Sequence, residues 1–351
     1  LPNRCAMQRF SEQKKHPEPI IQEYVFRAKL AEEADRFSET VSFMKRVVLA
    51  KHSVLSNEER NLFSVAYKKR ILLLRKSWRV LCRNEKREQL LDDIKTSAGS
   101  RSPRRISSCS TESHDSFHRK AERRFRIAQQ YRYKIERELF SVCSEVISLI
   151  EEILLPIASP ELARSIPEII GSSYELKERD YSLIESELSS QLSQLEANSR
   201  AMTSSNNDQT VVFYYKMIGD HYRYLAELSS TSERNPEQDS LLSLGAYFVA
   251  SEIAHTQLSP TDPVRLGLAL NFSVFYYEVM SQRDKACRVA KNAFDEAIAE
   301  IDQLAKASQS WYKDATHIMR MLRDNLTVWT QEDEEHEQDS DHEDQTEGSQ
   351  E

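Results

Sequence analysis

Glycine and proline are scarce in this chain, whose 351 residues include 6 Gly and 10 Pro. So few turn-forming residues exclude a fold built from many short strands and tight hairpins. Charged residues make up 30% of the sequence, and apolar residues recur every three to four positions over long stretches. We therefore predict an all-α protein, long enough for one large core or for two domains.

Motifs of catalysis and of metal binding are missing as well. The five cysteines are scattered and form no C-x-x-C pair, which favours a reducing, cytoplasmic location over a disulfide framework or a zinc site. The nine histidines form no metal-binding motif, and the sequence has neither a nucleophile elbow nor a P-loop. We expect no metal, no cofactor and no enzymatic activity.

Long hydrophobic runs are absent too. The most apolar segment, Val146 to Ile157, is too short to cross a membrane and contains Glu151 and Glu152. The first residues lack the pattern of a secretory signal peptide. We therefore expect no membrane partner.

Positive charge is missing from the end of the chain. The residues after Thr330 include eleven Asp or Glu and no Lys or Arg. Without those eleven negative charges the chain's formal charge of −8 becomes +3. The body is therefore slightly basic, and it could attract the acidic tail.

One stretch, Val211 to Leu228, combines a charged stripe with many aromatic residues. Lys216, Asp220, Arg223 and Glu227 follow one another at steps of four, three and four, which places them on one face of a helix. A solvated face is the ordinary interpretation of such a stripe. The alternative is a charged face turned into a shared cavity, because nearby Phe and Tyr side chains leave little surface for water. Arg, Lys and Tyr in such a cavity could hold a phosphate.

Four segments are similar to sequences of the 14-3-3 family. They are NEERNLFSVAYK at 57–68, GDHYRYLAEL at 219–228, RLGLALNFSVFYYEV at 265–279 and RDNLTVW at 323–329, in the family's order. The resemblance implies a cup-shaped bundle of about nine antiparallel helices around a concave amphipathic groove. It also implies an adaptor that binds phosphoserine or phosphothreonine peptides and regulates phosphorylated client proteins in signalling.

Basic residues on another predicted helix fit the family's phosphate pocket. This helix starts after a capping Ser56, and its Lys68 and Arg75 share a face about 10 Å apart along the axis. Alone, such a stripe is a weak signal and is more often solvated. The resemblance implies that Lys68, Arg75, Arg223 and Tyr224 ligate the phosphate, while Arg79 and Lys216 line the same wall.

Two asparagines lie within apolar helical stripes. Asn271 would be costly there if unpaired, so it is either satisfied in the core or grips the backbone of an extended peptide. The resemblance favours the second role, and it implies the same role for Asn325. The other residues implied to line the groove are Leu270, Val274, Glu278, Ile318, Met321 and Trp329.

The resemblance also implies contacts with a second subunit. The residues at the family's dimer positions are Leu30, Ala34, Arg36, Tyr131 and Glu138. Asn84 stands where the family usually has an apolar dimer residue. A homodimer, a heterodimer and a monomer therefore remain open.

Two insertions, 84–118 and 157–208, depart from the family. Residues 1–18 and 331–351 are expected to be disordered, on either side of a helical domain at 19–330. Residues 84–118, rich in Ser, Arg and Gly, are expected to form a disordered loop. Residues 157–208 are expected to hold an extra helix, from Tyr174 to Leu195, either packed loosely outside the body or acting as an interaction arm.

Two serines are candidate phosphorylation sites. Ser107 follows Arg104 and Arg105, as in substrates of basic-directed kinases, although the segment could equally be inert. Ser340 lies among Asp and Glu and suits an acid-directed kinase. The alternative function is an autoinhibited helical scaffold whose groove holds its own tail or its Ser-rich loop. A nucleic-acid partner is not expected, because the arginine cluster is isolated and the tail is acidic.

Overall fold

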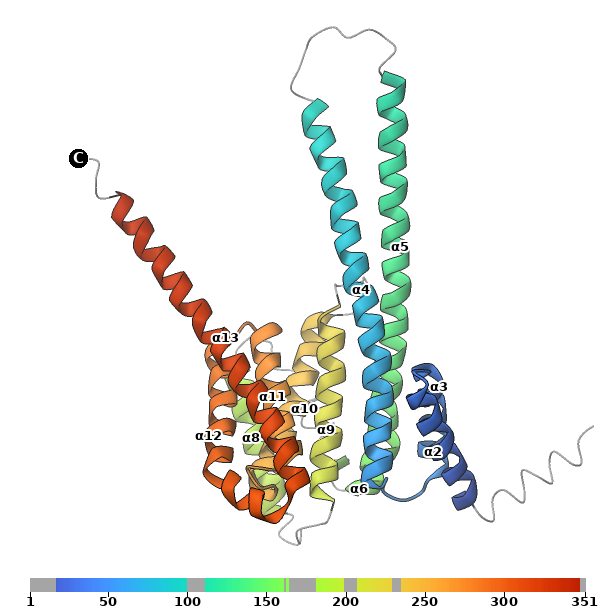
Figure 1. The fold of residues 1–351 in the computed structure, drawn as a ribbon, viewed down its shortest axis with the longest axis vertical. Coiled ribbons are helices and arrows are strands. Elements are labelled where there is room, and N and C mark those ends of the chain that lie inside the picture. The colour runs from blue at the N-terminus through green and yellow to red at the C-terminus, as the bar shows by residue number, and fades with distance from the viewer. Residues whose placement is uncertain are drawn as a thin grey trace, which may run out of the picture. The chain divides into compact units, whose positions relative to one another are not determined.

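The computed structural model describes residues 17–99, 111–160, 162–163, 181–198, 207–228 and 235–347. These residues form helices and no strand, so the all-α prediction is confirmed. The chain divides into two compact units, Leu1–Leu149 and Ile150–Glu351, whose elements are drawn in Figure 1. Within the described part, none of the helices has the length and hydrophobicity that a membrane span needs.

The first unit contains four helices that pack in chain order. They are α2 (Pro17–Glu33), α3 (Phe37–Ala50), α4 (Asn57–Gly99) and α5 (Thr111–Leu149). Asp35 adopts a left-handed φ of 55° between α2 and α3, a conformation that commonly ends a helix. Ser56 and Glu59 form a capping box at the start of α4, because each side chain accepts a hydrogen bond from the other's backbone N–H. This confirms Ser56 as the cap.

Helices α4 and α5 are longer than the sequence suggested. The structure continues α4 to Gly99 and begins α5 at Thr111, so a loop over the whole of 84–118 is wrong. The segment 84–94 contains no Gly or Pro and is rich in Glu, Lys, Arg, Gln and Leu, all good helix formers. Because serines and arginines follow this segment, the loop was predicted to start at residue 84, which is too early. Ser107 lies outside the described residues.

The second unit begins with a π-helical turn and is built around α9. Its elements are η1 (Ile150–Leu154), α6 (Leu155–Ala158), α8 (Tyr181–Asn198), α9 (Asp208–Ala226), α10 (Pro236–Gln257), α11 (Pro263–Glu278), α12 (Arg283–Ala307) and α13 (Gln309–Glu347). Helix α9 packs on α10 and α11, and α11 packs on α12 and α13. Asp262 caps α11 by accepting a hydrogen bond from the Val264 N–H at 2.7 Å. Pro263 occupies the first turn, where its fixed φ suits a helix and its missing N–H costs nothing.

Helix α8 confirms the extra helix in the second insertion, but its packing differs from the expectation. Ile184 and Leu188 are buried, and α8 contacts α10. Glu185 accepts hydrogen bonds from the Tyr276 hydroxyl at 2.8 Å and from Lys285 Nζ at 3.0 Å. The prediction that this helix packs loosely is therefore wrong, because α8 contacts three other helices of its unit.

Both ends of the domain also differ from the sequence prediction. Helix α2 begins at Pro17, and residues 1–16 lie outside the described part. Helix α13 continues to Glu347, into the tail that was expected to be disordered. Residues 331–347 contain Glu, Gln, Asp and His but no Gly or Pro, so nothing in this segment stops a helix.

Candidate functional site

Helix α9 lies at the centre of the second unit, and its charged stripe is not a solvated face. Asp220 and Arg223 are each 7% exposed, and Lys216 and Glu227 are half-buried. On the same helix Tyr214 and Tyr215 are buried, and Tyr222 and Tyr224 are half-buried. The interpretation of the stripe as an ordinary surface is therefore wrong. Its charges are held within the unit by specific partners.

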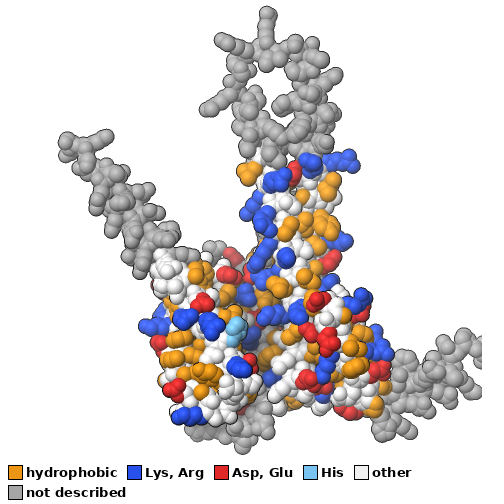
Figure 2. Space-filling model, viewed as in Figure 1, with side chains coloured by type: hydrophobic (Ala, Val, Ile, Leu, Met, Phe, Trp, Pro, Cys, Tyr) orange, Lys and Arg blue, Asp and Glu red, His pale blue; other side chains and the backbone are white. Residues whose placement is uncertain are grey.

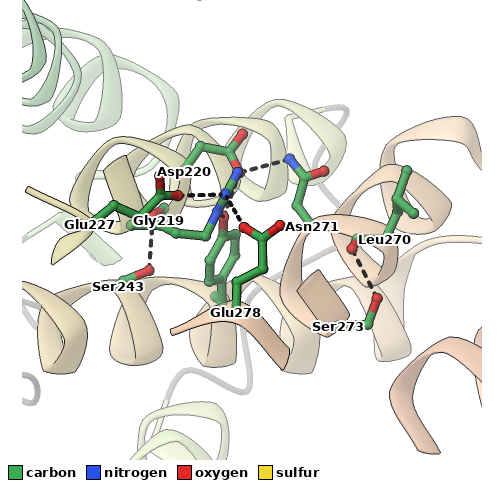
Figure 3. Close-up of polar contacts among 10 residues, drawn as sticks. Gly219, Asp220, Glu227, Ser243, Leu270, Asn271, Ser273 and Glu278 are labelled. Carbon is green, nitrogen blue, oxygen red and sulfur yellow. Dashed lines mark hydrogen bonds and ion pairs between the residues drawn. The ribbon is translucent and has the colours of Figure 1, made fainter. Parts of the chain in front are cut away.

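The carboxylate of Asp220 gathers three of these partners. Lys216 Nζ lies 2.9 Å from one carboxylate oxygen. The other oxygen accepts hydrogen bonds from the Tyr247 hydroxyl at 2.5 Å and from Asn271 Nδ2 at 2.7 Å. Figure 3 shows Asn271 reaching from α11 toward Asp220 on α9. Asp220 thus joins α9, α10 and α11 at one point.

Arg223 is held by a second group of partners. Its Nη1 lies 3.2 Å from Glu227 and 3.8 Å from Glu278, and its Nε donates to the Tyr247 hydroxyl at 3.4 Å. Figure 3 shows both glutamates turned toward this guanidinium. The guanidinium carbon also lies 4.7 Å from the Tyr224 ring centroid. A long side chain fixed on so many sides keeps little rotamer freedom.

The electrostatics of the cluster keep both central residues ionised. Burial would raise the pKa of Asp220, but Lys216, Arg223 and the Tyr247 hydrogen bond outweigh it, so the pKa is lowered. Burial would likewise lower the pKa of Arg223, but Tyr247, Tyr224 and Asp220 leave it raised. The pKa of Tyr247 is raised by burial and by Asp220, so this hydroxyl keeps its proton. The cluster is therefore a permanent, ordered set of charges.

Two neighbours of the cluster were missed by sequence reasoning. Tyr247 bridges Asp220 and Arg223 from α10, yet its surroundings in the sequence carry no motif. Gly219 lets α10 approach, because a Cβ there would lie within 3.0 Å of three Tyr247 ring atoms. The Ser243 hydroxyl also donates to the Gly219 carbonyl at 2.9 Å (Figure 3). A glycine inside a helix was the available signal of close packing.

The first unit carries the other expected phosphate ligands. Lys68, Arg75 and Arg79 lie on α4, with Lys68 and Arg79 exposed and Arg75 half-buried. Their spacing of seven and four places them on one face of this helix. Of the expected phosphate ligands, Lys68 and Arg75 thus lie on α4 of the first unit, and Arg223 and Tyr224 lie on α9 of the second.

The expected peptide-binding residues of the second unit lie on α11 and α13. Asn271 is half-buried with its amide on Asp220, and Leu270 is buried while Val274 is half-buried. On α13, Met321 is 43% exposed, and Ile318 and Asn325 are half-buried. Trp329 is buried and stacks on Tyr277 of α11 with ring centroids 4.8 Å apart. The ring pair fixes α13 against α11.

The expected dimer residues lie on α2, after it and on α5. Leu30, Ala34, Arg36 and Tyr131 are exposed, and Glu138 lies 3.9 Å from Arg70 of its own unit. Phe26 on α2 is also exposed, at 61%, although it was not among the expected dimer residues. Exposed apolar side chains that gather on one surface often mark a protein interface.

Comparison with known proteins decides which family has this arrangement. The family model described as 14-3-3 protein matches residues 27–166 and 173–330. The chain belongs to the 14-3-3 family. It is 39% identical over 310 residues to 14-3-3 protein 2 of Solanum lycopersicum, covering 88% of this chain and 91% of that protein. It is 40% identical over 306 residues to Protein BMH2 of Saccharomyces cerevisiae, covering 87% and 83%.

Membership confirms the resemblance seen in the sequence. A 14-3-3 protein is an adaptor that recognises phosphorylated peptides, and this is the function of the chain. The alternative, a scaffold whose groove is filled by its own tail or loop, is not supported over it. Which residues of this 14-3-3 protein hold the phosphate and the peptide is the subject of the proposal below.

Proposed function

We propose that this 14-3-3 protein binds one phosphate of a client through Lys68, Arg75, Arg223 and Tyr224. Arg75 and Arg223 donate bidentate, charge-assisted hydrogen bonds, Lys68 adds a point charge, and Tyr224 donates its hydroxyl. Arg79 and Lys216 line the same wall. The phosphate brings nearly two negative charges and three acceptor oxygens at neutral pH.

The observation that carries this proposal is the fixed geometry of Arg223. Its guanidinium is buried, yet Glu227, Glu278 and Tyr247 leave it ionised and oriented before any ligand arrives. A preorganised donor loses little entropy on binding. An unphosphorylated serine offers no charge to this cluster, so discrimination against it is expected to be large.

The peptide backbone is proposed to run along α11 and α13. Asn271 and Asn325 would hold the backbone through their amides, and Glu278 would accept hydrogen bonds from the peptide. An apolar wall beside these amides would take the apolar side chains of the peptide. Val274, Ile318 and Met321 would form its surface, and the buried Leu270 and Trp329 would support them. Both asparagines are half-buried, and the hydrogen bond from Asn271 Nδ2 to Asp220 orients that amide.

The partners are phosphorylated client proteins and a second 14-3-3 subunit, and the protein is proposed to bind them without catalysis in the cytoplasm. A dimer through the exposed Phe26 and Leu30 of α2 and Tyr131 of α5 would present two grooves to a doubly phosphorylated client. Free Cys82, Cys143 and Cys287 support a reducing compartment.

The test is fluorescence anisotropy with a labelled R-S-x-pS-x-P peptide and its unphosphorylated form. Arg75→Ala is expected to weaken phosphopeptide binding by about 1.5–3 kcal/mol, roughly 10-fold to more than 100-fold, because one charge-assisted contact is lost. Arg27→Ala on α2, which removes an equal charge from an exposed pair with Glu23, is the matched control. Equal binding of both peptides by the wild type would overturn the proposal.

A further inference from the structure

The basic face of α4 does not end at the proposed phosphate pocket. Beyond Lys68, Arg75 and Arg79, the same helix carries Arg83 and Lys86, which are both exposed. At 100° per residue, these five side chains fall within an arc of about 80° and extend over about 27 Å of helix. Figure 2 shows Lys and Arg side chains continuing along the arm formed by α4 and α5.

The acidic residues near this stripe are turned away from it. Glu85 is bound to Arg132 of α5 at 2.5 Å. Arg132 also pairs at 2.5 Å with Glu136, which accepts a hydrogen bond from Trp78 Nε1 at 2.9 Å. Glu136 and Arg132 are buried. At the face of α4 toward α5, one arginine thus engages two carboxylates, and these contacts fix the direction in which the stripe points.

Arg83 and Lys86 are the cations of the stripe that lie furthest along α4. Among the residues whose side chains the structure describes, no ion pair joins Arg83 or Lys86 to a carboxylate. Glu88 is half-buried and lies about 200° around the helix from Lys86. Adjacent cations without a carboxylate repel one another, and a bound anion would relieve that repulsion.

We infer that Arg83 and Lys86 form a second anion position, which selects clients carrying a second phosphate close to the first. This inference rests on the proposed function, since it extends the same wall of the same groove. The midpoint of Arg83 and Lys86 lies about 11 Å along α4 from the midpoint of Arg75 and Arg79, and about 16 Å from the mean position of Lys68, Arg75 and Arg79. An extended peptide covers these distances in three to five residues. The preferred ligand is thus a doubly phosphorylated peptide with this spacing.

The expected preference is modest, because both side chains are exposed. Exposed ion pairs contribute little each and are screened by salt. A second phosphate shared by two cations should tighten peptide binding about 5- to 10-fold at low salt, relative to the singly phosphorylated peptide. This gain in affinity should shrink as the salt concentration rises.

The experiment measures anisotropy with three labelled peptides. One carries a single phosphoserine, and the others add a second phosphoserine four residues before or four residues after it. The wild type is compared with Arg83→Ala/Lys86→Ala and with Lys134→Ala/Arg137→Ala, which removes the same charge from exposed positions on α5.

The expected result is a 5- to 10-fold gain for one doubly phosphorylated peptide with the wild type and the α5 variant. The Arg83→Ala/Lys86→Ala variant should lose that gain and still bind the singly phosphorylated peptide normally. If the wild type shows no gain in affinity, or if the gain survives in this variant, the inference is refuted and the proposed function is unaffected. Failure of the wild type to bind the singly phosphorylated peptide refutes the proposed function, and the inference with it.

Discussion

Replacing Gly219 by Ala tests how closely α9 and α10 must pack to build the cluster. A Cβ at this position would lie 2.7, 2.8 and 2.9 Å from three atoms of the Tyr247 ring, well inside the distance of a favourable carbon contact. The ring cannot easily move aside. It is fully buried, it stacks on Phe272 with centroids 5.3 Å apart, and its hydroxyl holds Asp220.

The magnitude follows from opposing effects. Ala is favoured over Gly inside a helix by about 1 kcal/mol. Overpacking a well-filled core costs about 1–3 kcal/mol, and a disturbed Tyr247–Asp220 hydrogen bond costs about 1–3 kcal/mol more because a buried acceptor loses its donor. We expect Gly219→Ala to lower the free energy of unfolding by about 1–5 kcal/mol in total, and to weaken phosphopeptide binding as Arg223 loses its support from Tyr247.

Gly267 on α11 provides a matched control. The nearest neighbour of a Cβ there is Lys216 Cε at 3.8 Å, which is ordinary contact. Gly267→Ala should therefore raise the free energy of unfolding by about 0.5–1 kcal/mol, through helix propensity alone. Urea denaturation followed by circular dichroism compares both variants with the wild type. If Gly219→Ala were as stable as Gly267→Ala, the close packing described here would be wrong.

Three further substitutions probe other parts of the second unit. Leu188→Ala should lower the free energy of unfolding by about 2–5 kcal/mol in urea, since this α8 side chain is fully buried; an effect no larger than that of exposed Ser190→Ala would mean that α8 is not packed. Asp220→Asn should cost about 3–5 kcal/mol in the same assay, because it removes one partner of buried charges, whereas exposed Asp302→Asn should change little. Burial lowers the pKa of His221 from 6.5, so the unfolded state binds the proton first and stability should fall as pH drops below about 6.5, by up to about 1.4 kcal/mol per pH unit. Thermal melts from pH 7.5 to 5 should show a weaker pH dependence for His221→Gln, and an unchanged dependence would contradict this assignment.

The sequence was sufficient to predict the helices and the residues of the charged stripe. Lys216, Asp220, Arg223 and Glu227 recur at helical spacing, and such local periodicity survives folding unchanged. The capping residues of α4 and α11 were also readable, because a cap acts on its own helix within three residues. Predictions that depend only on neighbours in sequence were therefore the reliable ones.

Features that depend on distant residues could not be predicted in this way. Glu185 is bound to Tyr276 and Lys285, which lie 91 and 100 residues away in the sequence. The packing of α8 therefore left no local signal. Tyr247 is bound to Asp220 across 27 residues, and periodicity on α10 does not distinguish it from any other core residue. The predicted α4 and α5 were too short. The Ser- and Arg-rich composition of the insertion obscured the helix-forming residues that follow Asn84.

The central claim is that Arg75 and Tyr224 ligate the same phosphate, and a double-mutant cycle tests it most directly. Phosphopeptide affinity is measured by anisotropy for the wild type, Arg75→Gln, Tyr224→Phe and the double variant. Groups that bind the same phosphate should be coupled by about 1 kcal/mol or more, so the double variant should lose less affinity than the sum of the two single losses. Losses that add within about 0.5 kcal/mol would show that Arg75 and Tyr224 act at separate places and would contradict the shared pocket.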